Sequence, residues 1–216
     1  MYKWKLSFTA ATVLAVLALV IALLAASAHA EGEGATPWEA SILGGVQGLM
    51  ENDTALPDNF VNIPLAAALA YHAGTIFAIE GEFAWLIPVA NTVSTGTGGS
   101  QDLKNPDVLS YQANLRAQLP WGAPALSPYL TAGVGAMTFL SATGADNHPQ
   151  LSESETAFAI NFGLGASIPL TQSLALRGDF REFVAFPQDD AAGLSDGTGA
   201  DPIWMPRGTF GLTYRF

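Results

Sequence analysis

Charged residues at alternate positions are the strongest sign of chemistry in this sequence. They are the acids and bases Glu80, Glu82, Arg116, Arg177, Asp179 and Arg181. Side chains two residues apart lie on the same face of a strand, and the residues between these charges are mostly apolar, as in the run LALRGDFR at 174–181. The pattern predicts that three acids meet three bases in an interior, because buried charges have to be paired.

Two kinds of chemistry are open to such an interior charge network. Paired charges can lock the interior into a plug that makes the surrounding structure rigid, and this is our main interpretation. The same residues can instead line a narrow path for ions or protons, which is the alternative. In either case they face inward, because an Arg that faces lipid at mid-bilayer costs roughly 2–4 kcal/mol.

Histidine and cysteine offer little for catalysis or metal binding. The chain has no cysteine, and only His72 and His148 follow residue 30. His148 lies beside Asp146 and near Ser152, but it falls in a predicted loop, whereas a general base needs a partner held in a fixed geometry. We therefore expect no enzyme, no cofactor and no metal site, and keep a lipid-modifying enzyme built on His148 as a further alternative.

The first 30 residues have the parts of a secretory signal peptide. Two lysines precede an apolar run at 8–26, and the small residues Ala28 and Ala30 predict cleavage after Ala30. An uncleaved anchor is the alternative, because the run is nearly long enough to span a bilayer. The expected mature domain, residues 31–216, has six basic against 19 acidic residues, which argues against nucleic acid as a partner.

Alternating apolar and polar residues predict eight strands. Seven are the segments 38–49, 63–71, 76–87, 108–119, 128–140, 157–170 and 174–186, and the eighth, 208–216, follows a loop at 187–206. The lengths suit tilted membrane strands of about 9–11 residues, and the connections are alternately long and short. The sequence therefore predicts an all-β fold, an eight-stranded antiparallel up-and-down transmembrane β-barrel preceded by a cleaved signal peptide.

The four long loops of this barrel are acidic. Lys104 is the only base within them, among many Asp and Glu residues. A solvated anionic surface is the simplest interpretation of these loops. Because carboxylate oxygens are the ligands that calcium and magnesium prefer, binding of divalent cations by the loops stays open.

The final strand has one apolar face. Phe210, Leu212, Tyr214 and Phe216 share this face, and Gly211, Thr213 and Arg215 share the other. A barrel strand that faces lipid has this pattern. A soluble lipocalin-like barrel is the rival interpretation, but it would turn the six charges outward and leave the terminal phenylalanine without a reason.

Four segments resemble the outer-membrane protein beta-barrel domain family, that is, the OmpA/OmpX-like eight-stranded barrels. They are residues 128–135 (PYLTAGVG), 162–166 (FGLGA), 174–181 (LALRGDFR) and 211–216 (GLTYRF). The resemblance implies a place in the outer membrane of a Gram-negative bacterium, with lipid and lipopolysaccharide as partners. It also implies that Phe210, Leu212, Tyr214 and Phe216 form a C-terminal signal for the barrel assembly machinery.

The resemblance says less about function, because one scaffold serves many roles. We expect a structural or surface-interaction role, with an interior plugged by paired charges and four acidic extracellular loops that contact extracellular ligands. The alternatives are a narrow ion-conducting pore and a lipid-modifying outer-membrane enzyme.

Overall fold

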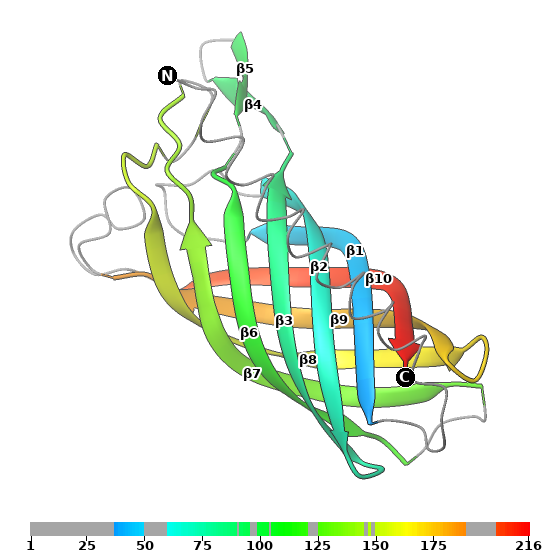
Figure 1. The fold of residues 1–216 in the computed structure, drawn as a ribbon. Helices are drawn as coiled ribbons and strands as arrows, with labels where there is room; N and C mark the ends of the chain where they lie inside the picture. The colour runs from blue at the N-terminus through cyan, green and yellow to red at the C-terminus, as the bar shows by residue number, and fades with distance from the viewer. Residues whose placement is uncertain are drawn as a thin grey trace.

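Eight long strands close into an antiparallel β-barrel (Figure 1). The computed structural model describes residues 37–49, 60–89, 91–95, 99–103, 105–120, 125–144, 147, 150–188 and 202–216. The barrel strands are β1 (Trp38–Leu49), β2 (Phe60–Ala73), β3 (Phe77–Pro88), β6 (Val108–Gln118), β7 (Ser127–Phe139), β8 (Glu155–Pro169), β9 (Leu174–Phe186) and β10 (Ile203–Arg215). A separate hairpin of β4 (Asn91–Thr95) and β5 (Gly99–Leu103) projects beyond one end of the barrel.

Each barrel strand pairs with the next one along the chain, and the first pairs with the last. The order around the barrel is β1-β10-β9-β8-β7-β6-β3-β2. β1 and β10 close it in a register that runs from Glu39↔Arg215 to Gln47↔Arg207. The predicted eight-stranded antiparallel up-and-down barrel is thus confirmed. Within the described residues no helix is long and apolar enough to cross a membrane.

The two ends of the barrel differ in their connections. The connections β2–β3, β6–β7 and β8–β9 are short, and they share one end with the start of β1 and the end of β10. We call this the turn end. The opposite end, which we call the loop end, carries the four longer connections, including the β4–β5 hairpin.

Side chains alternate between the outer surface and the lumen. The outer surface is apolar, and Ile79, Leu164 and Phe210 are 59%, 58% and 73% exposed on it. The lumen is narrow enough for side chains to fill, as expected for eight strands. Gly165 makes room there for the buried ring of Tyr129, which a Cβ at this position would approach to 2.5 Å. An apolar outer surface is the reverse of the polar exterior that a lipocalin-like barrel needs.

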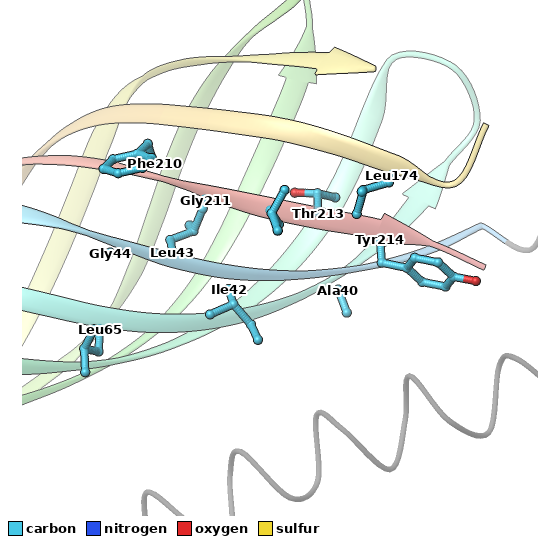
Figure 2. Close-up of a pocket in the computed structure, with 11 residues that line it drawn as sticks. Ala40, Ile42, Leu43, Gly44, Leu65, Leu174, Phe210, Gly211, Thr213 and Tyr214 are labelled. Atoms are coloured by element: carbon cyan, nitrogen blue, oxygen red, sulfur yellow. The ribbon is translucent and has the colours of Figure 1, made fainter. Parts of the chain in front are cut away.

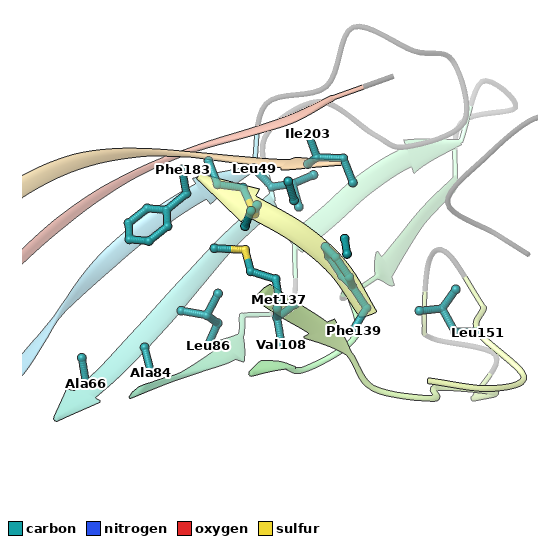
Figure 3. Close-up of a cluster of buried hydrophobic side chains, with 14 of the residues drawn as sticks. Leu49, Ala66, Ala84, Leu86, Val108, Met137, Phe139, Leu151, Phe183 and Ile203 are labelled. Carbon is teal, nitrogen blue, oxygen red and sulfur yellow. The ribbon is translucent and has the colours of Figure 1, made fainter. Parts of the chain in front are cut away.

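Apolar side chains fill the lumen toward the loop end (Figure 3). We call this set the apolar layer; its large members on the barrel strands are Leu43, Leu49, Leu86, Val108, Met137, Phe139, Phe183, Ile203 and Met205. None of them is more than 4% exposed. The sequence predicts charged, polar and small side chains for the lumen and no large apolar ones, so the apolar layer is a feature that the pattern did not indicate.

Two segments differ from the sequence predictions. The predicted loop at 187–206 is too long, because β10 already begins at Ile203. Pro206, which cannot donate to a ladder, suggests a loop, yet it remains paired with Glu182 of β9. The loop predicted after β3 contains the β4–β5 hairpin. The predicted signal peptide, residues 1–30, lies outside the described residues.

Replacing Phe183 with alanine should lower the free energy of unfolding by about 3–5 kcal/mol, because Phe183 is 0% exposed within the apolar layer. Phe180→Ala, on the same strand but 55% exposed on the outer surface, is the matched control and should cost less. Equilibrium unfolding in urea, with the barrel in lipid vesicles, measures both. Equal losses would contradict a packed apolar layer.

Candidate functional site

Eight charged side chains occupy the lumen between the turn end and the apolar layer. We call them the interior charge network: Glu39 (β1), Glu80 and Glu82 (β3), Arg116 (β6), Arg177, Asp179 and Arg181 (β9) and Arg207 (β10). None is more than 6% exposed. Four carboxylates face four guanidinium groups, so the network is neutral as a whole.

Glu80 is the centre of the interior charge network. One of its oxygens, Oε2, accepts hydrogen bonds from Arg177 Nη1 at 2.6 Å and from Arg116 Nη1 at 3.0 Å. Its other oxygen, Oε1, accepts from Arg181 Nη2 at 2.9 Å and from Asn114 Nδ2 at 3.3 Å. A single carboxylate that is 0% exposed therefore joins three arginines.

Asp179 and Tyr129 form a second junction. The Asp179 carboxylate accepts from Arg177 Nε at 2.8 Å and from Arg181 Nη2 at 3.1 Å. Tyr129 Oη donates to the same carboxylate at 2.7 Å, and its ring lies 4.7 Å from the Arg116 guanidinium carbon. Tyr129 thus connects β7 to charges that come from β6 and β9.

The interior charge network ends in a glutamate on each side, Glu39 toward the turn end and Glu82 toward the loop end. Toward the turn end, Glu39 accepts from Arg116 Nη1 at 2.7 Å and from Arg215 Nε at 3.2 Å, and its Oε2 lies 3.1 Å from His72 Nε2. Toward the loop end, Glu82 pairs with Arg207 and lies 3.3 Å from Arg181 Nη1.

Several of the ion pairs cross the lumen. Glu80 lies on β3, whereas Arg177 and Arg181 lie on β9, and these two strands are not neighbours in the barrel. Amide side chains join β6 to β8 in the same way, since Asn161 Nδ2 donates to Asn114 Oδ1 at 2.8 Å and to Gln112 Oε1 at 3.1 Å. Side-chain bonds therefore tie together walls that no backbone ladder connects.

The structure brings together all six charged residues that the sequence assigns to the interior. Sequence reasoning missed two members, Glu39 and Arg207. Glu39 lies inside the predicted first strand and is in phase with Ser41, so strict alternation indicates an inward side chain. Arg207 precedes the predicted start of the last strand, but it is in phase with Thr209 and Thr213. For both residues the signal in the sequence was an even spacing from inward-facing residues of the same strand.

The C-terminal residues lie on the outer surface. Phe210 and Leu212 are 73% and 48% exposed, and the rings of Tyr214 and Phe216 are 5.8 Å apart. Phe210, Leu212 and Tyr214 form an apolar groove of about 760 Å³ with residues of β1, β2 and β9. Figure 2 shows the side chains that line it. Ile42 and Leu65 line its other side.

Histidine forms no catalytic arrangement in the described part of the chain. His72 lies at the turn end and contacts Glu39. The Ser41 hydroxyl bonds to Thr213, at 2.8 Å, and accepts from Arg177 Nη1 at 3.2 Å. The described residues also contain no group of three or more His, Cys, Asp or Glu side chains that could hold a metal ion. His148, the other candidate from the sequence, lies outside the described residues.

Comparisons with known proteins agree on one class. The sequence model of the outer membrane protein beta-barrel domain matches residues 16–216. Neisserial surface protein A has a similar crystal structure, with a TM-score of 0.57 and 13% identity over 85% of this chain and 100% of that one. The N-terminal β-barrel domain of Pseudomonas aeruginosa OprF gives a TM-score of 0.50 and 10% identity, again over 85% of this chain and 100% of that one.

These structural likenesses show a common fold, whereas the family match covers nearly the whole chain. No curated protein sequence matches the chain significantly. The closed barrel, its apolar outer surface and the family match lead to one conclusion: the chain belongs to the outer membrane protein beta-barrel domain family and is a protein of the bacterial outer membrane.

Proposed function

We propose that this protein is a closed, non-conducting barrel with a structural or surface-interaction role, whose lumen is plugged by its own side chains. The observation that carries this proposal is the crossing of the lumen by Glu80, which is 0% exposed and bonded to arginines of the opposite wall. A plug of this kind supports rigidity, because any separation of β3 from β9 leaves charges unpaired.

The apolar layer supports a closed lumen independently of the charges. Ions need water or polar groups along their whole path, and hydrophobic constrictions stop conduction by excluding water. Leu86, Val108 and Met137 are each 0% exposed and come from three different strands. An ion that passed the interior charge network would still meet this dry section. The narrow ion-conducting pore is therefore the second candidate.

Enzymatic function has the weakest support. A Ser or Thr nucleophile needs a general base within hydrogen-bond reach of its hydroxyl. Among the described residues His72 contacts a carboxylate, and the carboxylates of the interior charge network are paired with arginines. We therefore propose no catalytic residue and no cofactor.

The orientation of the barrel in the outer membrane determines the partners that we propose for each of its surfaces. The turn end faces the periplasm and the loop end faces outward, as in barrels with short periplasmic turns. The outer surface contacts lipid, and the four acidic loops are proposed to contact lipopolysaccharide or extracellular ligands. Removal of residues 1–30 as a signal peptide, and reading of Phe210, Leu212, Tyr214 and Phe216 by the barrel assembly machinery, belong to the same proposal.

Conductance tests the proposed closed lumen directly. The refolded protein in a planar lipid bilayer should show no discrete openings, because the apolar layer leaves no hydrated path. A general porin in the same bilayer gives the positive control. Steady openings with a defined ion selectivity would contradict the plug and support the narrow pore.

Glu80→Ala should lower the free energy of unfolding by about 3–5 kcal/mol, because it leaves Arg116, Arg177 and Arg181 without a shared carboxylate. Glu153→Ala, at an exposed position after β7, should change it by about 0.5 kcal/mol or less. Urea unfolding in lipid vesicles compares the two. A loss for Glu80→Ala no larger than for the control would show that the cross-lumen pairs do not stabilise the barrel.

Phe216→Ala tests the proposed C-terminal signal. We expect less heat-modifiable barrel in outer membranes of cells, together with nearly unchanged folding of the purified chain into detergent micelles. Phe186→Ala removes a similar apolar side chain, 39% exposed, from β9 and is the matched control. If both variants reduce assembly equally, Phe216 acts through packing and not as a signal.

A further inference from the structure

Four polar side chains share one stretch of the lumen wall beside the apolar layer. They are Gln47 of β1, Asn62 of β2, and Arg207 and Thr209 of β10, and we call them the seam cluster. Gln47 lies opposite Asn62 on one side and opposite Arg207 on the other, so their side chains project into the lumen side by side. Gln47 and Asn62 are both 0% exposed.

Six polar atoms of the seam cluster have no hydrogen-bond partner among the described residues. They are Nε2 and Oε1 of Gln47, Nδ2 and Oδ1 of Asn62, Nη1 of Arg207 and Oγ1 of Thr209. Buried polar groups in native proteins are almost always bonded, and each unbonded one costs the loss of its contact with water. Six of them in one place would offset most of the stability of a typical domain.

The backbone of β1 lacks two strand donors at the same place. The β2–β3 ladder runs unbroken past Pro64, and the β9–β10 ladder runs unbroken past Pro206, so the position where each proline lacks an N–H faces β1. The β1–β2 register accordingly skips Gly45 and Val46 opposite Pro64 and Ile63. The β1–β10 register ends at Gln47↔Arg207, one residue before Pro206. The carbonyls of Gly45 and Gly48 therefore lose a strand donor.

We propose that the seam cluster is a binding site for a small group of buried water molecules. The site offers donors and acceptors in similar numbers, which suits a molecule that both donates and accepts. Glu82 already neutralises Arg207, so the site does not favour an anion. Because Gln47 and Asn62 are out of reach of solvent, the occupant has to be small enough to be enclosed during folding. Each buried water bonds about three polar groups, so roughly three waters serve these atoms and the two carbonyls.

The waters replace ladder bonds at the seam where the barrel closes. β1 has a proline opposite it on both neighbouring strands within the segment 44–48, and Arg207 of the same site is also part of the interior charge network. Water-mediated bonds therefore connect the closing strand to the network at a point where direct backbone bonds are missing. This inference does not depend on whether the lumen conducts.

A crystal structure at a resolution that shows ordered water tests the proposal on the unchanged protein. We expect water peaks within hydrogen-bond distance of the Gln47 and Asn62 amides and of the Gly45 carbonyl. Direct bonds between the two amides, or amides that contact only apolar atoms, would overturn the proposal.

Leucine substitutions separate the same outcomes in solution. If waters bond the amides, Gln47→Leu, Asn62→Leu and the double variant should each lower the urea midpoint of unfolding. Each variant removes hydrogen-bond partners of the waters and leaves the remaining polar groups of the site without full bonding. If the site is dry, all three should raise the midpoint by removing unpaired polar groups. If the amides bond each other, the single variants lower it and the double variant recovers it. Either of the last two patterns overturns the proposal.

Asn114→Leu is the matched control for these variants. Asn114 is also an interior amide, but its partners are the protein groups Glu80 and Asn161. Its loss should lower the midpoint under every interpretation of the seam cluster. The control thus shows that the assay detects the removal of a bonded amide from the lumen.

Discussion

Closure of the ladder between β1 and β10 is the constraint on which the rest of the structure depends. In lipid no water can bond an open strand edge, so a sheet that crosses the membrane has to close on itself. Closure with eight strands produces a lumen just wide enough for side chains. The interior must then be filled by the chain's own residues, and any charge among them must find its partner inside. The cross-lumen pairs of Glu80 follow from this geometry.

Most of the arginines of this acidic chain lie in the lumen. Eight Lys and Arg residues stand against 19 Asp and Glu, and four of the arginines lie in the interior charge network. Each of these four is paired with a carboxylate, so the lumen is neutral while the rest of the chain is strongly acidic. The excess negative charge is therefore carried outside the lumen, and the sequence assigns much of it to the long loops.

Periodicity predicted most of the fold, because an outer surface in lipid and a polar lumen impose opposite demands on alternate residues. The limits of β9 were predicted as they are, since charged residues alternate with apolar residues or glycine over 176–181. The start of β10 was missed because Pro206 resembles a strand breaker, although its missing N–H faces a gap in the β1 ladder. The apolar layer was missed because segments such as 183–186 are apolar on both faces and show no contrast.

The alternation of side chains along each strand indicated which charges face inward. It could not predict which acid bonds to which arginine. Arg177 is two residues from Asp179 and also bonds Glu80, 97 residues away. That second contact depends on the stagger of strands around the barrel, which a single strand does not encode. The apolar layer then separates the paired charges from the loop end. Because the apolar layer fills the lumen between them, the pairs of the interior charge network form within the barrel, between its own strands.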